Sequence, residues 1–213
     1  MRRGELLQDD EASIGVGSLI IFIAMIMVAG VTASVLLQTM NSLQQQALET
    51  GAETINEISS GVRVTQVSGY SDGSNVTEVA IFVSTIAGSK SIDLSNTFVS
   101  ISDTSSRVIL NYESNCFNNG VSNGLFQTLN SSKLSNKTFG VIVIRDADGS
   151  CLSATPVIND NDLVALMVNT TSCFSGIDVR TEVSGNVVPE QGMRGVIAFT
   201  TPSAFTDTIL NLQ

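Results

Sequence analysis

The stretch SIGVGSLIIFIAMIMVAGVTASVLLQ, residues 13–38, contains no charged side chain and is overwhelmingly apolar. It is longer than the run of about 20 apolar residues that an α-helix needs to cross a bilayer. Leu, Met and Ala are strong helix formers, and no turn signal interrupts the run. The sequence therefore predicts a long apolar helix that must be covered by lipid or by other protein.

The helical pattern continues beyond this stretch. Apolar side chains recur at steps of three and four residues, at Leu36, Met40, Leu43 and Ala47, and later at Ile55, Ile58 and Val62. We therefore expect one helix over residues 13–60, with a length of about 70 Å. That length exceeds the hydrocarbon thickness of a membrane, which is about 30 Å. A membrane anchor followed by a stalk fits this pattern, and so does a helix that packs against copies of itself.

The composition excludes several classes of function. The chain has 213 residues, with 20 acidic and 10 basic side chains, a net charge of −10 and no histidine. An acidic chain lacks the clustered Lys and Arg that neutralise phosphates, so no nucleic acid is expected as a partner. Histidine-based catalysis is excluded, and the sequence contains no nucleophile elbow or Gly-rich phosphate loop. We therefore expect a structural protein that requires no cofactor, and not an enzyme.

Residues 61–213 differ from the helix in composition. They are rich in Ser, Thr, Asn, Val and Ile, and turn residues divide them into short segments. Eight segments have the pattern of β-strands: 62–67, 78–86, 97–102, 107–112, 138–145, 163–170, 177–183 and 195–200. The continuous apolar run VALMV, residues 164–168, indicates a central strand. The expected fold class is α+β, with the long N-terminal helix followed by an all-β immunoglobulin-like sandwich.

The first twelve residues, MRRGELLQDDEA, are charged and polar, like a leader peptide that is removed from the mature chain. Their removal takes away two basic and four acidic side chains, so the mature chain would carry 8 against 16 and a net charge of −8. Cleavage after Ala33, as in a conventional signal peptide, is an alternative. The apolar region before Ala33 is longer than the usual 7 to 15 residues, which favours cleavage before the helix.

A mature chain that begins with this helix needs an apolar environment. Thirteen large apolar side chains lie between Leu19 and Leu37. Their burial is worth roughly 20 kcal/mol, as an upper estimate. The helix therefore either stays in lipid or associates with other copies as the core of a polymer.

Four Asn-x-Ser/Thr sequons occur in the C-terminal part, at Asn75, Asn130, Asn136 and Asn169. In an exported protein each is a candidate for N-glycosylation. A chain this rich in Asn, Ser and Thr also contains such sequences by chance, so the sequence does not select among the four.

The segment RDADGS, residues 145–150, places Asp146 and Asp148 one residue apart ahead of Gly149. Two carboxylates at this spacing can turn toward one hard cation. Calcium is the expected metal, because oxygen ligands are abundant and imidazole is absent. The alternative is a simple Asp-Gly turn that follows a strand. The segment NDND, residues 159–162, has the same two interpretations.

The three cysteines, Cys116, Cys151 and Cys173, lie in the C-terminal half and show no CxxC spacing. One disulfide and one free thiol fit an extracellular chain, and the sequence does not select among the three pairings. The alternative is three buried free thiols, since Cys is often a small core residue.

The apolar stretch and the C-terminal block VPEQGMRGVIAFTTPSAFTDTILNLQ, residues 188–213, together resemble archaellins, the archaeal flagellins. Archaellins are similar to type IV pilins at the N-terminus, where a short leader precedes an IGxG start and the segment LIxFIAMxxVA. The segments FGVIVIRDADGS and NDNDLVALMVN extend the resemblance into the β-domain. Residues at matching positions of the helix are Ile14, Gly15, Val16, Gly17, Leu19, Ile20, Phe22, Ile23, Ala24, Met25, Val28 and Ala29.

The resemblance implies where the chain is processed and how it assembles. A prepilin-type peptidase would cut the Ala12–Ser13 bond and remove residues 1–12, while RRG at residues 2–4 offers a competing bond before Glu5. Residues 13–60 would form the assembly helix and residues 61–213 the outer β-domain. The expected assembly residues are Gly15, Gly17, Leu19, Ile20, Phe22, Ile23, Met25, Ile26, Val28 and Gly30. The resemblance also implies glycans at sequons and a bound metal in the outer domain, with calcium at Asp146 and Asp148 as the expectation.

The implied function is that of a structural subunit of the archaellum. The precursor would be inserted transiently in the membrane, and the mature chain would form an extracellular homopolymer, with or without paralogous archaellins. A membrane-embedded motor would rotate this filament for swimming. Two alternative functions are also compatible with the sequence. One is an adhesive type IV-like pilin, and the other is a monomeric extracellular β-domain that a single span anchors to the membrane.

Overall fold

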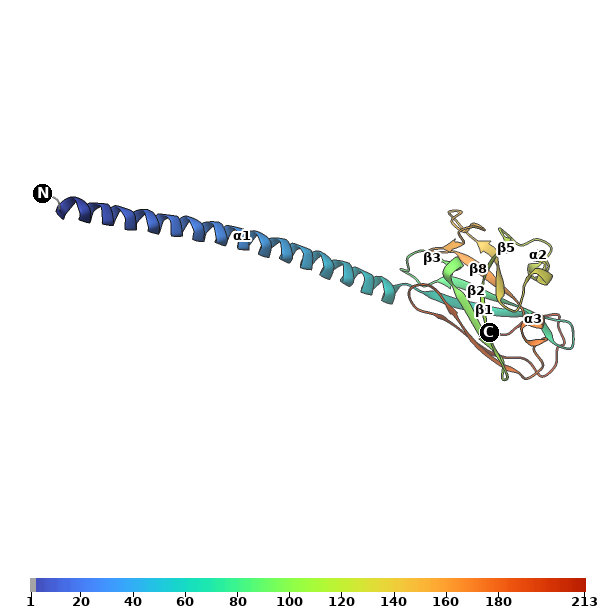
Figure 1. Ribbon diagram of the computed structural model, residues 1–213. Coiled ribbons are helices and arrows are strands. Elements are labelled where there is room, and N and C mark those ends of the chain that lie inside the picture. The colour runs from blue at the N-terminus through green and yellow to red at the C-terminus, as the bar shows by residue number, and fades with distance from the viewer. Residues whose placement is uncertain (1–2) are drawn as a thin grey trace. The chain divides into compact units, whose positions relative to one another are not determined.

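The computed structural model describes the backbone from Arg3 to Gln213 and the side chains from Gly15 onward. The chain divides into two compact units, one that ends at Glu53 and one that comprises Thr54–Gln213. The first unit is helical. The second holds the last turns of the same helix and all the strands (Figure 1).

A single helix, α1 (Arg3–Ser59), contains 57 residues, which corresponds to a length of about 85 Å (Figure 1). It begins earlier than the expected residue 13, so the predicted start is wrong for the full-length chain. Residues 5–12 are Glu, Leu, Gln, Asp and Ala without Gly or Pro, and nothing in them stops a helix that propagates from the apolar stretch. The helix ends at Ser59, where the sequence predicts an end near residue 60.

A tight connection links α1 to the sheet. The Ser60 N–H donates the last helical hydrogen bond to the Asn56 carbonyl oxygen at 2.8 Å. Gly61 has a φ of +156°, and a Cβ atom there would lie 2.7 Å from the backbone of Met193. The Met193 N–H donates to Ser60 O (2.8 Å), and the Val62 N–H donates to Met193 O (3.0 Å). Backbone hydrogen bonds on both sides of Gly61 therefore fix the point where the chain enters the sheet.

The described chain after α1 contains eleven strands and four short helices. The strands are β1 (Val62–Ser71), β2 (Val76–Thr85), β3 (Ile92–Asp93), β4 (Phe98–Ser102), β5 (Arg107–Asn118), β6 (Thr138–Arg145), β7 (Val157–Ile158), β8 (Leu163–Asn169), β9 (Glu182–Val188), β10 (Gly195–Thr200) and β11 (Ile209–Asn211). The short helices are η1 (Leu94–Asn96), α2 (Leu125–Thr128), η2 (Ser131–Lys133) and α3 (Thr170–Phe174).

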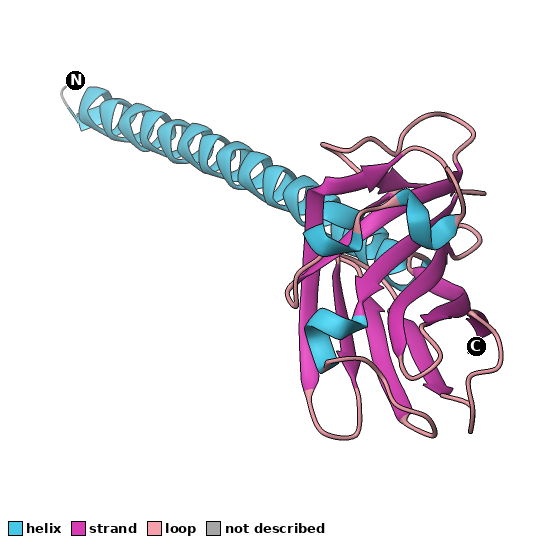
Figure 2. Cartoon of the chain, turned by 90° about the vertical axis from the view of Figure 1, so that its right-hand side faces the viewer, coloured by secondary structure: helices cyan, strands magenta, loops and turns pink. Residues whose placement is uncertain are grey.

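Nine strands form one sheet in the order β10-β9-β4-β5-β6-β8-β2-β1-β11, and β3 and β7 form a small second sheet. Neighbours in the large sheet are antiparallel except β5 and β6. The large sheet curls until its ends meet (Figure 2). The Gln213 side chain closes the seam, because its Oε1 accepts from the Ala198 N–H (2.9 Å) and its Nε2 donates to Val196 O (3.4 Å). Two halves of one sheet thus face each other across the interior.

The interior of the curled sheet holds the main hydrophobic core. Alternate residues of the strands point into it, as the two-residue period of a strand requires. Side chains that are less than 2% exposed there include Ile81, Leu110, Phe139, Leu166 and Ile197. The expected α+β class, with an apolar helix followed by a large β-domain, is confirmed.

A second, smaller core lies on the outer face of the sheet over β2, β6 and β8. Residues 119–137, which include α2 and η2, place Phe126 and Leu134 against Ile142 and Met167. The Tyr70 and Phe126 rings pack with their centroids 5.5 Å apart. Strand β8 is therefore buried on both faces, which explains why residues 164–168 form a continuous apolar run.

The predicted strand over residues 177–183 is wrong for most of its length. Arg180 has a φ of +57°, in the left-handed region, which interrupts an extended chain. The Thr181 N–H donates to Thr201 Oγ1 (2.8 Å) and the Arg180 N–H donates to Pro202 O (3.2 Å), so this segment turns alongside the end of β10. Strand β9 begins only at Glu182, and its register extends to Val188.

Candidate functional site

The apolar part of α1 is exposed on every side in the isolated chain. All thirteen large apolar residues between Leu19 and Leu37 are exposed, and Phe22, for example, is 61% exposed. The helix Gly15–Ser59 is long and apolar enough to cross a membrane, by length and composition. A helix that is apolar all round is stable only when it is surrounded by lipid or by other apolar segments.

Two polar side chains inside this stretch, those of Ser18 and Thr32, are satisfied by the helix itself. Thr32 Oγ1 donates to the carbonyl oxygens of Val28 (2.8 Å) and Ala29 (3.0 Å). Ser18 Oγ donates to Gly15 O at 2.9 Å. Hydroxyls that bond backward along the helix add little to the cost of burying it in apolar surroundings.

The three glycines of the expected assembly residues do not serve the fold of this chain. Apart from the adjoining residues and the backbone of α1 itself, no atom lies within 4 Å of the Cβ position at Gly15, Gly17 or Gly30. Small residues on an apolar helix let the backbone of a neighbouring helix approach closely. These positions are therefore available for contacts with other helices.

The expected leader bond, Ala12–Ser13, lies within the backbone span of α1. Its side chains lie outside those that the structure describes, so the cleavage site stays a prediction.

An acidic cluster combines the two segments that the sequence singles out separately. Carboxylate oxygens of Asp146, Asp148 and Asp162 lie within 4.8 Å of one another. The pairing of Arg145 with Leu163 joins the end of β6 to the start of β8 and brings both loops to the same end of the sheet. Spacing in the sequence identifies Asp146 and Asp148, but it does not show that Asp162 joins them.

Asp162 is the unusual member of this cluster, because it is only 1% exposed. Its Oδ2 accepts a hydrogen bond from the Asn159 N–H at 2.9 Å, whereas its Oδ1 has no hydrogen-bond partner among the described residues. A buried carboxylate oxygen without a partner is costly. A positively charged ligand beside this oxygen would offset that cost.

Hydrogen bonds hold the other two carboxylates in place. Asp146 accepts from the N–H groups of Gly149 (2.8 Å) and Cys151 (3.0 Å). Asp148 accepts from Asn159 Nδ2 at 2.6 Å and from the Ser150 N–H at 3.1 Å. The hydrogen bonds from Ser150 and Asn159 lower the pKa of Asp148 to about 2, so the side chain is ionised at neutral pH. The cluster is an oxygen-donor set of the kind that calcium prefers.

The four sequons occupy different environments. Asn130 and Asn136 are exposed in the segment that covers the outer core. Asn169 is buried, its Nδ2 donates to Ser131 O (2.9 Å), and its Oδ1 caps α3 by accepting from the Ser172 N–H (3.1 Å).

The Asn75 amide is also engaged in the fold. With the amide oriented so that its nitrogen faces both acceptors, Nδ2 donates to Asp178 Oδ1 (2.8 Å) and to Ser74 O (2.7 Å). Its side chain packs against Gly176, where a Cβ atom would lie 2.9 Å from Asn75 Cβ. The Nδ2 groups of Asn75 and Asn169 therefore serve the fold. Asn130 contributes only its Oδ1, which caps η2 by accepting from the Ser132 N–H (3.0 Å).

All three cysteines are free thiols in the structure, so the expected disulfide is not formed there. The alternative of three buried thiols holds for Cys116 and Cys151, while Cys173 is partly exposed. Cys116 belongs to the outer core, while Cys151 belongs to the main core and Cys173 packs against it from α3. Burial raises the pKa of Cys151 to about 12, with a contribution from the nearby carboxylates of Asp146 and Asp162, and raises that of Cys173 to about 11. These thiols act as small core residues.

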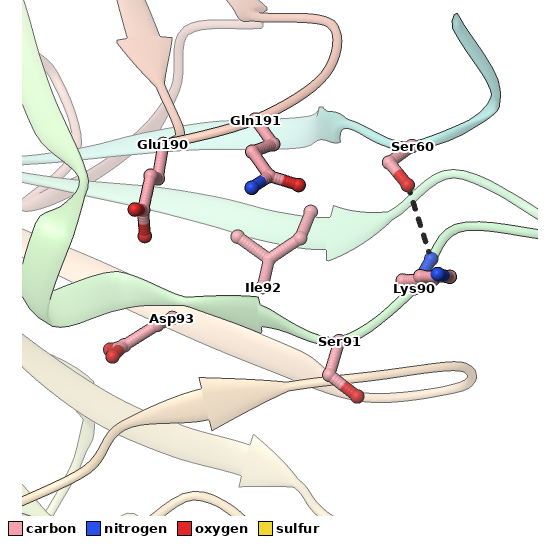
Figure 3. Close-up of a pocket in the computed structure, with 7 residues that line it drawn as sticks. All are labelled: Ser60, Lys90, Ser91, Ile92, Asp93, Glu190 and Gln191. Carbon is pink, nitrogen blue, oxygen red and sulfur yellow. Dashed lines mark hydrogen bonds between the residues drawn. The ribbon is translucent and has the colours of Figure 1, made fainter. Parts of the chain in front are cut away.

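A shallow polar pocket of about 140 Å³ lies beside the connection from α1. Figure 3 shows its lining residues, Ser60, Lys90, Ser91, Ile92, Asp93, Glu190 and Gln191. Ser60 Oγ accepts a hydrogen bond from the Lys90 N–H at 3.3 Å, which ties the loop before β3 to the helix end. These seven side chains include no nucleophile paired with a base, so the pocket supports the connection rather than catalysis.

Comparison with known proteins gives a consistent result. A model of the archaeal-type flagellin family matches residues 12–199. Flagellin B2 of Methanocaldococcus jannaschii is 42% identical over 219 aligned residues, with 100% of both chains covered. The crystal structure of archaeal flagellin FlaB1 from the same organism has a TM-score of 0.65 at 34% identity, and covers 72% of this chain and 97% of that one.

The archaeal flagellum of Methanospirillum hungatei strain JF1 shares the fold. Its TM-score is 0.64 over 93% of this chain and 98% of that one, at 14% identity. The apolar helix, the curled sheet and the match over nearly the whole length lead to one conclusion. This chain belongs to the archaeal-type flagellin family.

Proposed function

We propose that this chain polymerises through the apolar stretch of α1 to form the archaellum filament, of which it is a structural subunit and not an enzyme. One observation carries the proposal: thirteen large apolar side chains between Leu19 and Leu37 are exposed on all sides of the helix. Their burial is worth roughly 20 kcal/mol. The membership in a flagellin family supports the identity of the polymer.

Other copies of the chain cover this helix better than lipid does. Exposed apolar residues continue past the stretch at Met40, Leu43, Leu48, Ile55 and Ile58. A bilayer covers only about 20 residues of a helix. A bundle of identical helices can cover the whole stripe, and Gly15, Gly17 and Gly30 permit close packing within it.

The need to cover the apolar stretch of α1 also explains how the chain would be processed and exported. The precursor would be held in the membrane by the apolar stretch until a prepilin-type peptidase cuts Ala12–Ser13 and removes the charged leader. The mature subunit would then join an extracellular filament, with or without paralogous archaellins, that a membrane-embedded motor rotates for swimming. The charge of the leader supports this order, because four acidic residues at the head of the helix would be costly to bury in a bundle.

Two measurements test the proposal. Mass spectrometry of the filament protein should give Ser13 as the first residue, whereas an uncut chain would favour a membrane anchor and a start at Ser34 would remove the assembly segment. A chain truncated through Leu48 should leave cells without filaments. Fibres of ordinary appearance from the truncated chain would refute assembly through α1.

Calcium is proposed as a structural ligand of the sheet domain. Asp146, Asp148 and Asp162 would hold it, and the unpartnered Oδ1 of Asp162 supports this assignment. The ion would compensate three neighbouring negative charges and would tie the loop after β6 to the loop before β8.

Glycans are proposed at Asn130 and Asn136, because both side chains are exposed on loops. Modification of Asn75 or Asn169 would disturb Nδ2 groups that already donate hydrogen bonds in the fold, whereas the cap of η2 uses only the Oδ1 of Asn130. Peptide mapping of the filament protein should therefore find glycan on the first pair. Glycan on Asn169 would contradict the burial of its side chain.

A further inference from the structure

The outer surface of the curled sheet has two unlike halves. Residues 119–137 cover the half formed by β2, β6 and β8 and bury an apolar cluster there. The half formed by β4, residues 107–112 of β5, β9 and β10 has no such cover among the described residues, whereas Cys116 near the end of β5 belongs to the covered cluster. We call its outward-pointing residues the bare face; they are Phe98, Ser100, Ile109, Asn111, Ser184, Asn186, Val188, Val196 and Ala198.

Strand register places the apolar members of the bare face close together. One row across the sheet runs from Val196 through Asn186 and Ser100 to Ile109. The next row contains Val188 opposite Phe98. Val196 and Ile109 are each 55% exposed and Phe98 is 38% exposed. The bare face therefore presents large apolar side chains separated by small hydroxyl and amide groups.

The bare face carries no charge. The charged outward residues of these four strands are Arg107, Glu113 and Glu182, and all three lie beyond its edge. Arg107 and Glu182 lie opposite Ser102 and Thr200, and Glu113 follows Asn111 along β5. The centres of protein interfaces are depleted of charge and enriched in apolar side chains relative to the rest of a surface. A strand face with this composition in an acidic chain with 20 carboxylates is therefore typical of a surface that is covered in the assembled protein.

The sequons avoid this half of the domain. Asn75 lies in the turn between β1 and β2, and Asn169 lies at the end of β8. Asn130 and Asn136 lie in the segment that covers the other half of the sheet. None of these four asparagines belongs to β4, β5, β9 or β10. Glycans at these positions would leave the bare face free for contact with protein.

The bare face also begins where α1 joins the sheet. Strand β10 follows Met193, which pairs with Gly61 immediately after the helix. Phe98, the first residue of β4, and Val188, the last residue of β9, lie at the same end of the sheet. Copies that are joined through their helices bring this end of each sheet domain close to the next, so a second copy is the partner within reach.

We propose that the bare face binds the sheet domain of an adjacent copy of this chain in the filament. The proposal rests on polymerisation through α1. Four strands about 4.8 Å apart and six residues at about 3.3 Å each cover roughly 400 Å². Stable interfaces bury about 800 Å² per partner. The contact is therefore too small to pair free subunits, and it strengthens a polymer that α1 has already gathered.

Two valines of similar exposure provide a matched test. Val196 lies on the bare face, and Val121, which is 49% exposed, lies in the covering segment on the other half of the sheet. Val196→Lys as the only archaellin in the cell should shorten or abolish filaments, because each contact would bury an unpaired ammonium group. Val121→Lys should give filaments of parental length. Both variants, released in detergent, should unfold at the parental temperature, since neither side chain is in a core.

Thiol labelling measures the contact directly in variants that still assemble. Val196→Cys should react at least tenfold more slowly with a water-soluble maleimide in intact filaments than in detergent-released subunits. Val121→Cys should react at similar rates in both, and the parent chain gives the background from its own cysteines. Equal rates for Val196→Cys, or parental filaments from Val196→Lys, would refute the interface. Failure of the parent chain itself to polymerise would instead refute the proposed function.

Discussion

Two phenylalanines of this chain occupy opposite environments. Phe139, in β6, is completely buried in the main core, whereas Phe22, in α1, is 61% exposed in the isolated chain. The sheet domain covers its apolar side chains with its own strands and loops. The apolar part of α1 covers none of its own, so its stable environment must come from outside the chain. The same residue type therefore contributes to folding in one region and to assembly in the other.

The largest expected effect comes from replacing a phenylalanine by alanine in each region and comparing the results. Phe139→Ala removes a fully buried ring and should lower the free energy of unfolding of the sheet domain by about 3–5 kcal/mol. Phe22→Ala should leave that free energy unchanged and should weaken filaments. Denaturant titration of the detergent-released full chain, followed by circular dichroism, measures the first quantity, and the yield of sedimentable filaments measures the second.

A loss of stability in Phe22→Ala comparable to that in Phe139→Ala would show that α1 folds against the sheet domain. Unchanged filament yield in Phe22→Ala would show that this ring lies outside the helix contacts. Either result would contradict the conclusion that the sheet domain contributes to folding and the apolar part of α1 to assembly.

The second prediction concerns the connection between the two regions. Gly192 has a φ of +90°, and a Cβ atom there would lie 2.3 Å from Ser60 O. Gly73 has a similar φ of +94° with no atom within 4 Å of its Cβ position. Gly73→Ala should cost about 1 kcal/mol for the left-handed backbone alone. Gly192→Ala should cost about 3 kcal/mol, because overpacking against the backbone of Ser60 is added.

Unfolding of the two glycine variants by denaturant measures the difference. Equal losses of unfolding free energy in the two variants would mean that the backbone between Ser60 and Val62 can move to make room for the new Cβ atom. The hydrogen bonds to Met193 would then not fix the connection. A larger loss for Gly192→Ala, together with frequent breaks or kinks in filaments, would show that the fold of the domain and the helix end depend on the same contact.

The third prediction tests whether the sheet domain also depends on a ligand. With calcium at about 100 times its dissociation constant, the parent chain should gain about 2.7 kcal/mol of stability over the chelated chain. Asp162→Asn should lose most of this gain. In chelator the same variant should be as stable as the parent or more stable, because a buried carboxylate with one unpartnered oxygen is replaced. Thermal unfolding with calcium and with chelator measures both effects.

Asp160→Asn is the matched control, since Asp160 is exposed and lies two residues away outside the cluster. It should keep the calcium response of the parent. A full calcium response in Asp162→Asn would contradict the assignment of this carboxylate as a ligand.

The helix and the central strands could be predicted from the sequence because their signals are local. A charge-free run of residues 13–38 and a continuous apolar run at 164–168 each report directly on burial. The strand predicted over 177–183 failed because its alternation of apolar and polar residues is real, whereas hydrogen bonds from Arg180 and Thr181 to residues after β10 bend the backbone. β11 was missed, since three residues at an edge carry too short a pattern.

Only part of the acidic cluster could be predicted, because the sequence shows only those members that are close along the chain. Asp146 and Asp148 are neighbours in the sequence, whereas Asp162 reaches them only through the pairing of β6 with β8. For the cysteines, the sequence predicts a bond that the structure does not contain. An extracellular setting favours a disulfide, but all three thiols are free. Cys116 lies in a different core from Cys151 and Cys173, which accounts for the two pairings that would include Cys116.

The smallest expected effect is a pH dependence of the stability of the sheet domain. The pKa of Asp148 is about 2 in the folded chain, below its ordinary value of 3.8, because Ser150 and Asn159 donate hydrogen bonds to the ionised carboxylate. A lowered pKa contributes stability that is complete above about pH 4 and is lost as the pH falls toward 2. In chelator, the unfolding midpoint of the parent should therefore decline between these values more steeply than that of Asp148→Asn. Parallel declines would mean that these hydrogen bonds form equally with the protonated carboxyl, and that the loop after β6 owes its conformation to Asp146 instead.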